Sequence, residues 1–505
     1  MKILTLSEKR KQIAEAKKRK KAKSPPQEEL IRLLEHYQTG QYDDAEKLAV
    51  YITQEFPYHQ FGWKVLGAIL GQTSRISEAV NANQKSVELA PQDAEAHNNL
   101  GNTLKELGRF DEAEVSYTQA IALKPSFAEA HYNLGNTLQE LGRFDEAEAS
   151  YTQAIALKPD YALAHKNLGM ALNAMGLTKS ALPYFEKNLQ LERGANPLNL
   201  HHKSFRNISK AKIDHDIEQF EYLAKSGYEV KRFHELATLY KKVSSEINCA
   251  QDTDVLPISH KQLNLLGDTY NRPIHILEAP ALEKTPIGDS LDVNKITKDY
   301  FDHEFGLTHI DDFLTPAALK SLREFLLGST IWFDFFHDGG YMGAYLAEGL
   351  ASPLILQVAE DLRNKFPEIF KNHRLTHLWA YKYDSRASEK NNSFTGIRAH
   401  ADSAAVNVNF WITPKSANFD SSSGGLVVYN GEAPLEWDFK TYNNDAKKIS
   451  EEILKSKQKT VVPYNENRAV IFNSNLFHET DKIEFREGYE NRRINVTMLF
   501  GTRGL

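Results

Sequence analysis

Residues 99–125 read NLGNTLKELGRFDEAEVSYTQAIALKP, and residues 133–159 repeat this stretch almost letter for letter. A spacing of 34 residues recurs along the chain in Pro57, Pro91, Pro125 and Pro159, in Gly67, Gly101, Gly135 and Gly169, and in Ala45, Ala79, Ala113, Ala147 and Ala181. Small residues at a fixed spacing mark points where helices approach closely, and proline ends a helix. The pattern predicts about five repeated units over residues 27–193, stacked so that each unit buries the apolar face of its neighbour.

A unit of this length with this leucine–glycine, alanine and proline pattern resembles the tetratricopeptide repeat. The resemblance implies an all-α solenoid that binds a peptide or a protein partner. Asn99, Asn133 and Asn167 occupy the same position in three repeats. A similar asparagine ladder lines the repeat superhelix of the O-linked N-acetylglucosamine transferases. We expect these three amides to bind a peptide backbone, because an amide both donates and accepts hydrogen bonds. The alternative is that they only support packing between repeats.

The second half of the chain has a different pattern. Amphipathic helices are expected at residues 316–327 and 353–366. Short strands are expected at residues 375–383, 404–413, 425–429, 460–462, 468–472 and 493–501. Helices followed by a run of short strands predict an α+β domain with a jelly-roll core over residues 299–505, and hence a multidomain protein.

Three residues of this domain have the composition of a metal site. His400 and Asp402 form a His-x-Asp pair, and His478 follows after a long interval. Two imidazoles and one carboxylate make up the facial triad that holds non-haem Fe(II) and leaves other coordination positions open. We expect loops at residues 339–348 and 385–394 to form the mouth of the pocket.

Strand alternation collects polar side chains on shared faces. Asn407 and Asn409 lie on one face of the strand at 404–413, and Arg493, Asn495 and Thr497 lie on one face of the strand at 493–501. Inside a barrel these faces would line a pocket, whereas on an open sheet they would only face solvent.

With these motifs, residues 300–505 resemble the 2-oxoglutarate- and Fe(II)-dependent dioxygenases, most closely the prolyl-hydroxylase-like group. The resemblance implies a double-stranded β-helix, which is the jelly roll of that family. It also implies that His400, Asp402 and His478 are the catalytic ligands of Fe(II), that 2-oxoglutarate is the cosubstrate and that O2 is the oxidant.

The resemblance also identifies a cosubstrate site. Arg493, in an Arg-x-x-x-Thr pattern, is expected to pair with the far carboxylate of 2-oxoglutarate, with Arg492 and Arg486 as alternatives. Tyr383 is expected to donate a hydrogen bond to the same carboxylate, with Tyr381 as the alternative. The expected cosubstrate-binding residues are Arg493, Tyr383, Thr497 and Asn409.

The combination of a peptide-binding module with an oxidising module predicts a hydroxylase whose protein or peptide substrate is held by the repeats. One alternative is a small-molecule or sugar oxygenase whose repeats serve assembly. Another is a non-catalytic repeat scaffold.

The remaining sequence features limit the cellular location and the classes of partner that we expect. Residues 1–26 are predicted to be a basic disordered arm, and residues 194–298 a helical cap with an irregular connection. A net charge of −6 over 505 residues argues against a nucleic-acid partner except at this arm. A single cysteine, Cys249, and the absence of a long apolar run predict a cytoplasmic protein without a membrane partner.

Overall fold

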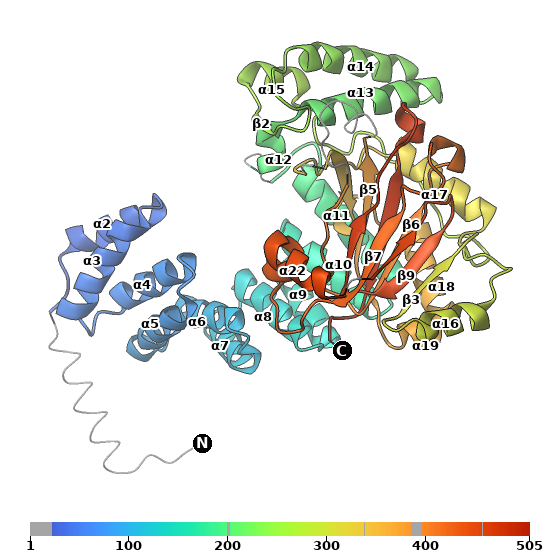
Figure 1. Ribbon diagram of the computed structural model, residues 1–505. Coiled ribbons are helices and arrows are strands. Elements are labelled where there is room, and N and C mark those ends of the chain that lie inside the picture. The colour runs from blue at the N-terminus through green and yellow to red at the C-terminus, as the bar shows by residue number, and fades with distance from the viewer. Residues whose placement is uncertain (1–22, 199–201, 338, 385–395, 457, 505) are drawn as a thin grey trace. The chain divides into compact units, whose positions relative to one another are not determined.

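The computed structural model describes residues 23–198, 202–337, 339–384, 396–456 and 458–504 (Figure 1). Most of the predicted basic arm and the expected loop at 385–394 therefore lie outside the described residues. The chain divides into two compact units, Met1–Ala171 and Leu172–Leu505. None of the helices within the described ranges combines the length and the apolar character that a membrane crossing requires.

The first unit is a succession of antiparallel helix pairs, as the repeat predicts. Its helices are α2 (Gln27–Gln38), α3 (Tyr42–Glu55), α4 (Gln60–Gln72), α5 (Ile76–Leu89), α6 (Ala94–Glu106), α7 (Phe110–Leu123), α8 (Ala128–Glu140), α9 (Phe144–Leu157) and most of α10 (Ala162–Ala174). A Cβ atom on Gly101 would lie 2.6 Å from the ring of Tyr117, and one on Gly135 would lie 2.7 Å from that of Tyr151. The repeated glycine is therefore required where the two helices of a pair touch.

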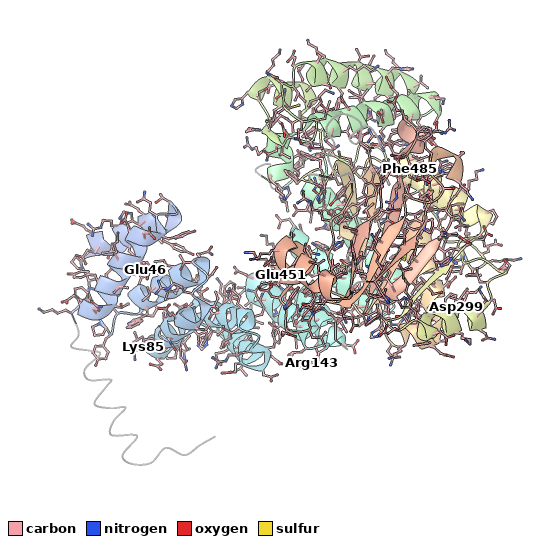
Figure 2. All side chains as sticks on the ribbon, in the orientation of Figure 1. Glu46, Lys85, Arg143, Asp299, Glu451 and Phe485 are labelled. Atoms are coloured by element: carbon pink, nitrogen blue, oxygen red, sulfur yellow. The ribbon has the colours of Figure 1, made fainter. Side chains whose placement is uncertain are left out.

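Surface ion pairs link successive repeats. Arg143, labelled in Figure 2, pairs with Glu146 of its own helix and with Glu114 of the preceding repeat, each at 2.6 Å. Arg75 makes an equivalent pair with Glu46 of the repeat before it, at 2.5 Å. Solvent screens exposed ion pairs of this kind, so most of the stability comes from the buried alanine, glycine and tyrosine contacts.

The last repeat helix, α11 (Thr178–Arg193), belongs to the second unit. The amide of Asn188 donates to the carbonyl of Ala347 at 2.8 Å, and Arg193 forms an ion pair with Glu348 at 2.7 Å. The predicted boundary at residue 193 is thus displaced to 171/172, because the polar groups of the last helix find their partners in the following domain.

The predicted cap and connection contain more helix than expected. The elements are α12 (Lys203–Arg206), β1 (Asn207–Ile208), α13 (Lys210–Lys225), α14 (Val230–Ser245), β2 (Leu256–Pro257), α15 (His260–Leu266) and α16 (Val293–Asp302). Helices α13 and α14 pack side by side (Figure 1), with the rings of Phe220 and Phe233 stacked 5.8 Å apart. Helix α16 crosses the predicted border at 298/299, because Asp292 caps it and Ile296 and Tyr300 anchor it in the core.

Besides the β1–β2 pair, the described strands of the second unit form two antiparallel sheets. A six-stranded sheet has the order β3-β9-β6-β11-β5-β4, and a three-stranded sheet has the order β10-β7-β8. The strands are β3 (Leu307–Ile310), β4 (Tyr341–Tyr345), β5 (Leu375–Tyr383), β6 (Val406–Trp411), β7 (Leu426–Glu432), β8 (Lys459–Val462), β9 (Ala469–Asn473), β10 (Leu476–Thr480) and β11 (Ile494–Phe500). One buried cluster joins Trp411 and Phe472 of the larger sheet to Val428 and Val462 of the smaller one, with Phe485 beside them (Figure 2). The sheets therefore pack face to face.

Helices cover the other face of the larger sheet. Val408, Val496 and Met498 point to that face and are fully buried, and Figure 1 shows α17 and α18 along this side. The remaining helical segments of the domain are α17 (Pro316–Gly328), η1 (Leu346–Glu348), α18 (Pro353–Lys365), α19 (Pro367–Phe370), η2 (Lys415–Ala417), α21 (Phe439–Asn444), α22 (Ala446–Ser456) and η3 (Tyr489–Asn491). Strand β4 lies in the segment 339–348 that was expected to be a loop, because it pairs along its whole length with β5.

Candidate metal centre

Backbone pairing brings His400, Asp402 and His478 together. The amide of His400 donates to the carbonyl of His478 at 3.1 Å, and the amide of His478 donates back at 2.8 Å. The amide of Asp402 donates to the carbonyl of Ser474 at 3.1 Å. The loop before β6 is thus held against β10 and the turn that precedes it. One ligand atom from each of the three residues lies within 4.8 Å of the other two.

The ring nitrogens of the two histidines have distinct partners. Nδ1 of His400 lies 2.9 Å from the carbonyl oxygen of Arg398, and Nδ1 of His478 lies 3.0 Å from that of Leu476. Because a carbonyl oxygen only accepts, each Nδ1 carries the proton and each Nε2 keeps its lone pair. Nε2 of His400 lies 3.7 Å from Oδ1 of Asp402, and Nε2 of His478 lies 3.4 Å from Oδ2. Three metal-binding atoms therefore converge.

The protonation states of these side chains at neutral pH suit the binding of a metal ion. Burial lowers the pKa of His400 to about 4, so its imidazole is neutral at pH 7. Burial, the largest influence, would raise the pKa of Asp402, but the polar groups around the carboxyl group together lower its pKa below the usual value, so it is ionised at pH 7. The group therefore offers the neutral imidazole of His400, the imidazole of His478 and one carboxylate, a donor set that suits a divalent first-row metal ion.

The segment between β7 and β8 contacts the loop that carries His400 and Asp402. The amide of Ala401 donates to the carbonyl of Tyr442 at 3.0 Å, and the side chain of Asn443 donates to the carbonyl of Ala401 at 3.3 Å. Ala401 and Phe477, neighbours of the ligands in sequence, share a buried cluster with Tyr442 and Ile449. Sequence reasoning missed α21 and α22, although Ile449 and Ile453 have the four-residue spacing of an apolar helix face.

Of the three candidate arginines, Arg493 points between the sheets. Its Nε donates to the carbonyl of Gly424 at 2.7 Å and one Nη to that of Gly425 at 3.1 Å, while Nη1 is buried without a hydrogen-bond partner among the described residues. The guanidinium lies 4.9 Å from the ring centre of Tyr383 and 5.5 Å from that of Trp411. Burial lowers the pKa of Arg493. Arg493 is thus a buried cation whose Nη1 amino group makes no hydrogen bond to the described residues.

The other two arginines are engaged elsewhere. Arg492 points to the opposite face of β11 and forms ion pairs with Glu218 at 2.8 Å and Asp384 at 3.3 Å. Arg486 is exposed and donates to the carbonyl of Ser416 at 2.8 Å. The geometry therefore favours Arg493 over both alternatives as a binding group inside the domain.

The two candidate tyrosines also differ in their surroundings. The hydroxyl of Tyr383 lies 3.5 Å from that of Thr480, two residues beyond His478 on β10. Tyr381 lies two residues earlier on the same face of β5 and hydrogen-bonds to Tyr345. Tyr383 is therefore the tyrosine that lies between Arg493 and the strand of the distal histidine.

Asn409 and Thr497 lie in a buried series of hydrogen bonds that ends on Asp402, one of the three candidate metal ligands. Thr497 Oγ1 donates to Asn409 Oδ1 at 2.6 Å, and Asn495 Nδ2 donates to the same oxygen at 2.9 Å. Asn409 Nδ2 donates to Asn407 Oδ1 at 2.8 Å, and Asn407 Nδ2 donates to Asp402 Oδ2 at 2.5 Å. These bonds already engage the side chains of Asn409 and Thr497. Contact of the two residues with a cosubstrate stays a prediction.

The asparagines of the repeats have partners within the solenoid. Nδ2 of Asn133 donates to Oδ1 of Asn98 in the preceding repeat at 3.1 Å. Nδ2 of Asn167 donates to Oδ1 of Asn136 at 2.7 Å. The carbonyl of Asn99 accepts from the side chain of Thr103 at 3.2 Å. These bonds favour the packing alternative for Asn133 and Asn167, and peptide binding by the three residues stays a prediction.

Comparisons with known proteins concern the repeats. Tetratricopeptide-repeat families match residues 82–115, 101–142 and 128–161. This part of the chain therefore carries such repeats, as the 34-residue spacing predicts. A crystal structure of MamA is 27% identical, covers 31% of this chain and 91% of its own, and has a TM-score of 0.30. A second crystal structure of MamA is 26% identical and covers 33% and 92%, with a TM-score of 0.30. No curated protein matches the chain.

Proposed function

We propose that the C-terminal unit is an Fe(II)- and 2-oxoglutarate-dependent dioxygenase that hydroxylates a protein or peptide. The observation that carries the proposal is the convergence of His400, Asp402 and His478, with their ligand atoms within 4.8 Å of one another. Two antiparallel sheets packed face to face support the jelly-roll core of that enzyme class. The repeats supply the module for a protein partner.

The residues fit the metal and its cosubstrate. Nε2 of His400, Nε2 of His478 and one oxygen of Asp402 would hold Fe(II) on one face. The unpartnered Nη1 of Arg493 fits the far carboxylate of 2-oxoglutarate, whose charge would neutralise the buried guanidinium. Tyr383 would donate its hydroxyl hydrogen to the same carboxylate, since burial raises the pKa of this phenol and keeps it protonated. Bound Fe(II) supplies the oxidation of 2-oxoglutarate by O2 to succinate and CO2, coupled to hydroxylation of a substrate C–H bond.

The inner face beyond this site supports an uncharged substrate group. Trp379 and Tyr381 of β5 and Tyr345 of β4 share this face and are partly exposed. The carboxylate of Asp334 accepts a hydrogen bond from the hydroxyl of Tyr345 at 2.6 Å and lies 3.0 Å from Nε2 of His337. Partly exposed aromatic rings suit the aliphatic or cyclic side chain of a peptide better than a phosphate backbone.

The test uses the purified full chain under anaerobic conditions. We expect Mn(II), a redox-stable substitute for Fe(II), to bind in titration calorimetry, and 2-oxoglutarate to bind measurably only after the metal. His400→Ala is the control, and circular dichroism checks that it is folded. Equal metal binding by the wild type and His400→Ala would reject the proposed centre.

A further inference from the structure

We propose that Asn407, Asn409 and Thr497 are positioning residues for Asp402, acting on the metal centre through one directed chain of hydrogen bonds. The inference rests on the function proposed above, because it gives these side chains a role only if Asp402 binds a metal ion. It also assigns Asn409 and Thr497 a role other than cosubstrate binding.

The direction of the hydrogen bonds in this series follows from the carboxylate of Asp402, at which the series ends. An ionised carboxylate only accepts hydrogen bonds, so Asn407 presents its NH2 group to Asp402 at 2.5 Å and its oxygen to the next residue. Asn409 therefore presents its NH2 group to Asn407 at 2.8 Å and its own oxygen to Thr497 and Asn495. Every donor in the chain points toward the carboxylate, so the bonds polarise one another in the sense that stabilises its negative charge.

The residues of this hydrogen-bond series lie on the neighbouring strands β6 and β11 of the larger sheet. Asn409 of β6 lies directly opposite Thr497 of β11, and Asn407 follows two residues away on the same face. Asn407 is fully buried, and Asn409, Asn495 and Thr497 are at most 5% exposed. A buried amide that loses its hydrogen-bond partner destabilises the fold, so we expect these side chains to keep this one arrangement.

The chain determines which carboxylate oxygen faces the metal. Asn407 holds Oδ2 of Asp402, which also lies 3.4 Å from Nε2 of His478, and thereby leaves Oδ1, 3.7 Å from Nε2 of His400, as the oxygen for a metal ion. With Oδ2 restrained, Asp402 would bind through one oxygen and would not rotate to use both. Two imidazoles and a monodentate carboxylate leave three positions of an octahedral ion open for other ligands, whereas a bidentate carboxylate would leave two.

The test measures the affinity of the full chain for Mn(II) alone by titration calorimetry, with Co(II) visible spectra as a second readout. The variants are Asn407→Leu and Asn409→Leu, which keep the side-chain size, and Thr497→Val, which replaces a hydroxyl with a methyl group at the far end. Val408→Ala is the matched control, because Val408 lies between the two asparagines but points to the opposite face. It should lower the thermal midpoint and leave metal affinity unchanged.

We expect Asn407→Leu to weaken Mn(II) binding by about 10–100-fold and Thr497→Val by a smaller factor, both with altered Co(II) spectra. Wild-type affinity and spectrum in folded Asn407→Leu would overturn the inference while leaving the proposed metal centre intact. If Asn407→Leu does not fold, Thr497→Val decides in the same way. Equal weakening in Val408→Ala would also overturn it, since general loosening of the strand would then explain the effect. A wild-type chain that binds neither Mn(II) nor Co(II) would reject the metal centre itself.

Discussion

Replacing Arg493 with methionine should separate stability from cosubstrate binding. Without a ligand, Arg493 is a buried cation whose contacts within the described residues include two carbonyl oxygens and two aromatic rings. Each hydrogen bond from a charged donor contributes about 1.5–3 kcal/mol, and burying the charge costs several kcal/mol in the opposite direction. The two effects nearly cancel, so Arg493→Met should change the free energy of unfolding by less than about 2 kcal/mol.

Binding of 2-oxoglutarate should respond very differently. Removing one partner of a buried, hydrogen-bonded charge pair costs about 2–5 kcal/mol of binding free energy. With about 1.4 kcal/mol for each factor of ten, the dissociation constant should rise by roughly 30-fold or more. Titration calorimetry on the Mn(II)-loaded chain measures this constant, and urea unfolding measures stability.

The neighbouring arginine is the matched control. Arg492 is also buried but is paired with Glu218 and Asp384, so Arg492→Met leaves two carboxylates without their cation and should cost about 3–5 kcal/mol of stability. At a temperature where this variant is folded, it should bind 2-oxoglutarate with nearly wild-type affinity. Wild-type affinity in Arg493→Met, or its loss in Arg492→Met alone, would refute the assignment.

Two further predictions concern stability. Asn133→Ala should lower the free energy of unfolding of the repeats by about 1 kcal/mol, because it removes the bond to Asn98; unchanged thermal unfolding with lost peptide capture would instead favour a binding role. The hydrogen bonds from Arg468 lower the pKa of Asp311 to about 2, below the ordinary value of about 3.9, so this pair stabilises the fold above pH 4 and its contribution is lost as the pH falls through 2. Asp311→Asn should therefore be less stable than the wild type at pH 7, by no more than about 1 kcal/mol because the carboxylate is half-exposed, and the difference in urea midpoint should shrink toward pH 2. A difference that stays constant from pH 7 to pH 2 would contradict this.

Periodic features could be predicted from the sequence. The 34-residue spacing gives the helix pairs, because the repeated glycine lies where the two helices touch, as Gly101 does against Tyr117 and Gly135 against Tyr151. The predicted bounds of β5 match the structure, since alternating aromatic residues mark that strand clearly. The alternation in β6 and β11 correctly groups Asn409 with Trp411 and Arg493 with Thr497, because a strand sends every second side chain to the same face.

Features that depend on contacts between distant segments could not be predicted. The boundary between the units moved because Asn188 and Arg193 bond to residues more than 150 positions later. The choice between Arg492 and Arg493 required knowing which face of β11 meets the second sheet. The chain from Thr497 to Asp402 depends on the register of β6 against β11, which sequence alternation alone leaves undetermined.

Conversion of 2-oxoglutarate to succinate separates an enzyme from a repeat scaffold. The full chain is loaded with Fe(II) without oxygen, mixed with 2-oxoglutarate and cell extract as a source of substrate, and then exposed to O2. We expect succinate to form above the level of a folded His400→Ala control, and to fall strongly in Arg493→Met. Succinate formation equal to that of His400→Ala, with and without extract, would contradict the proposed dioxygenase.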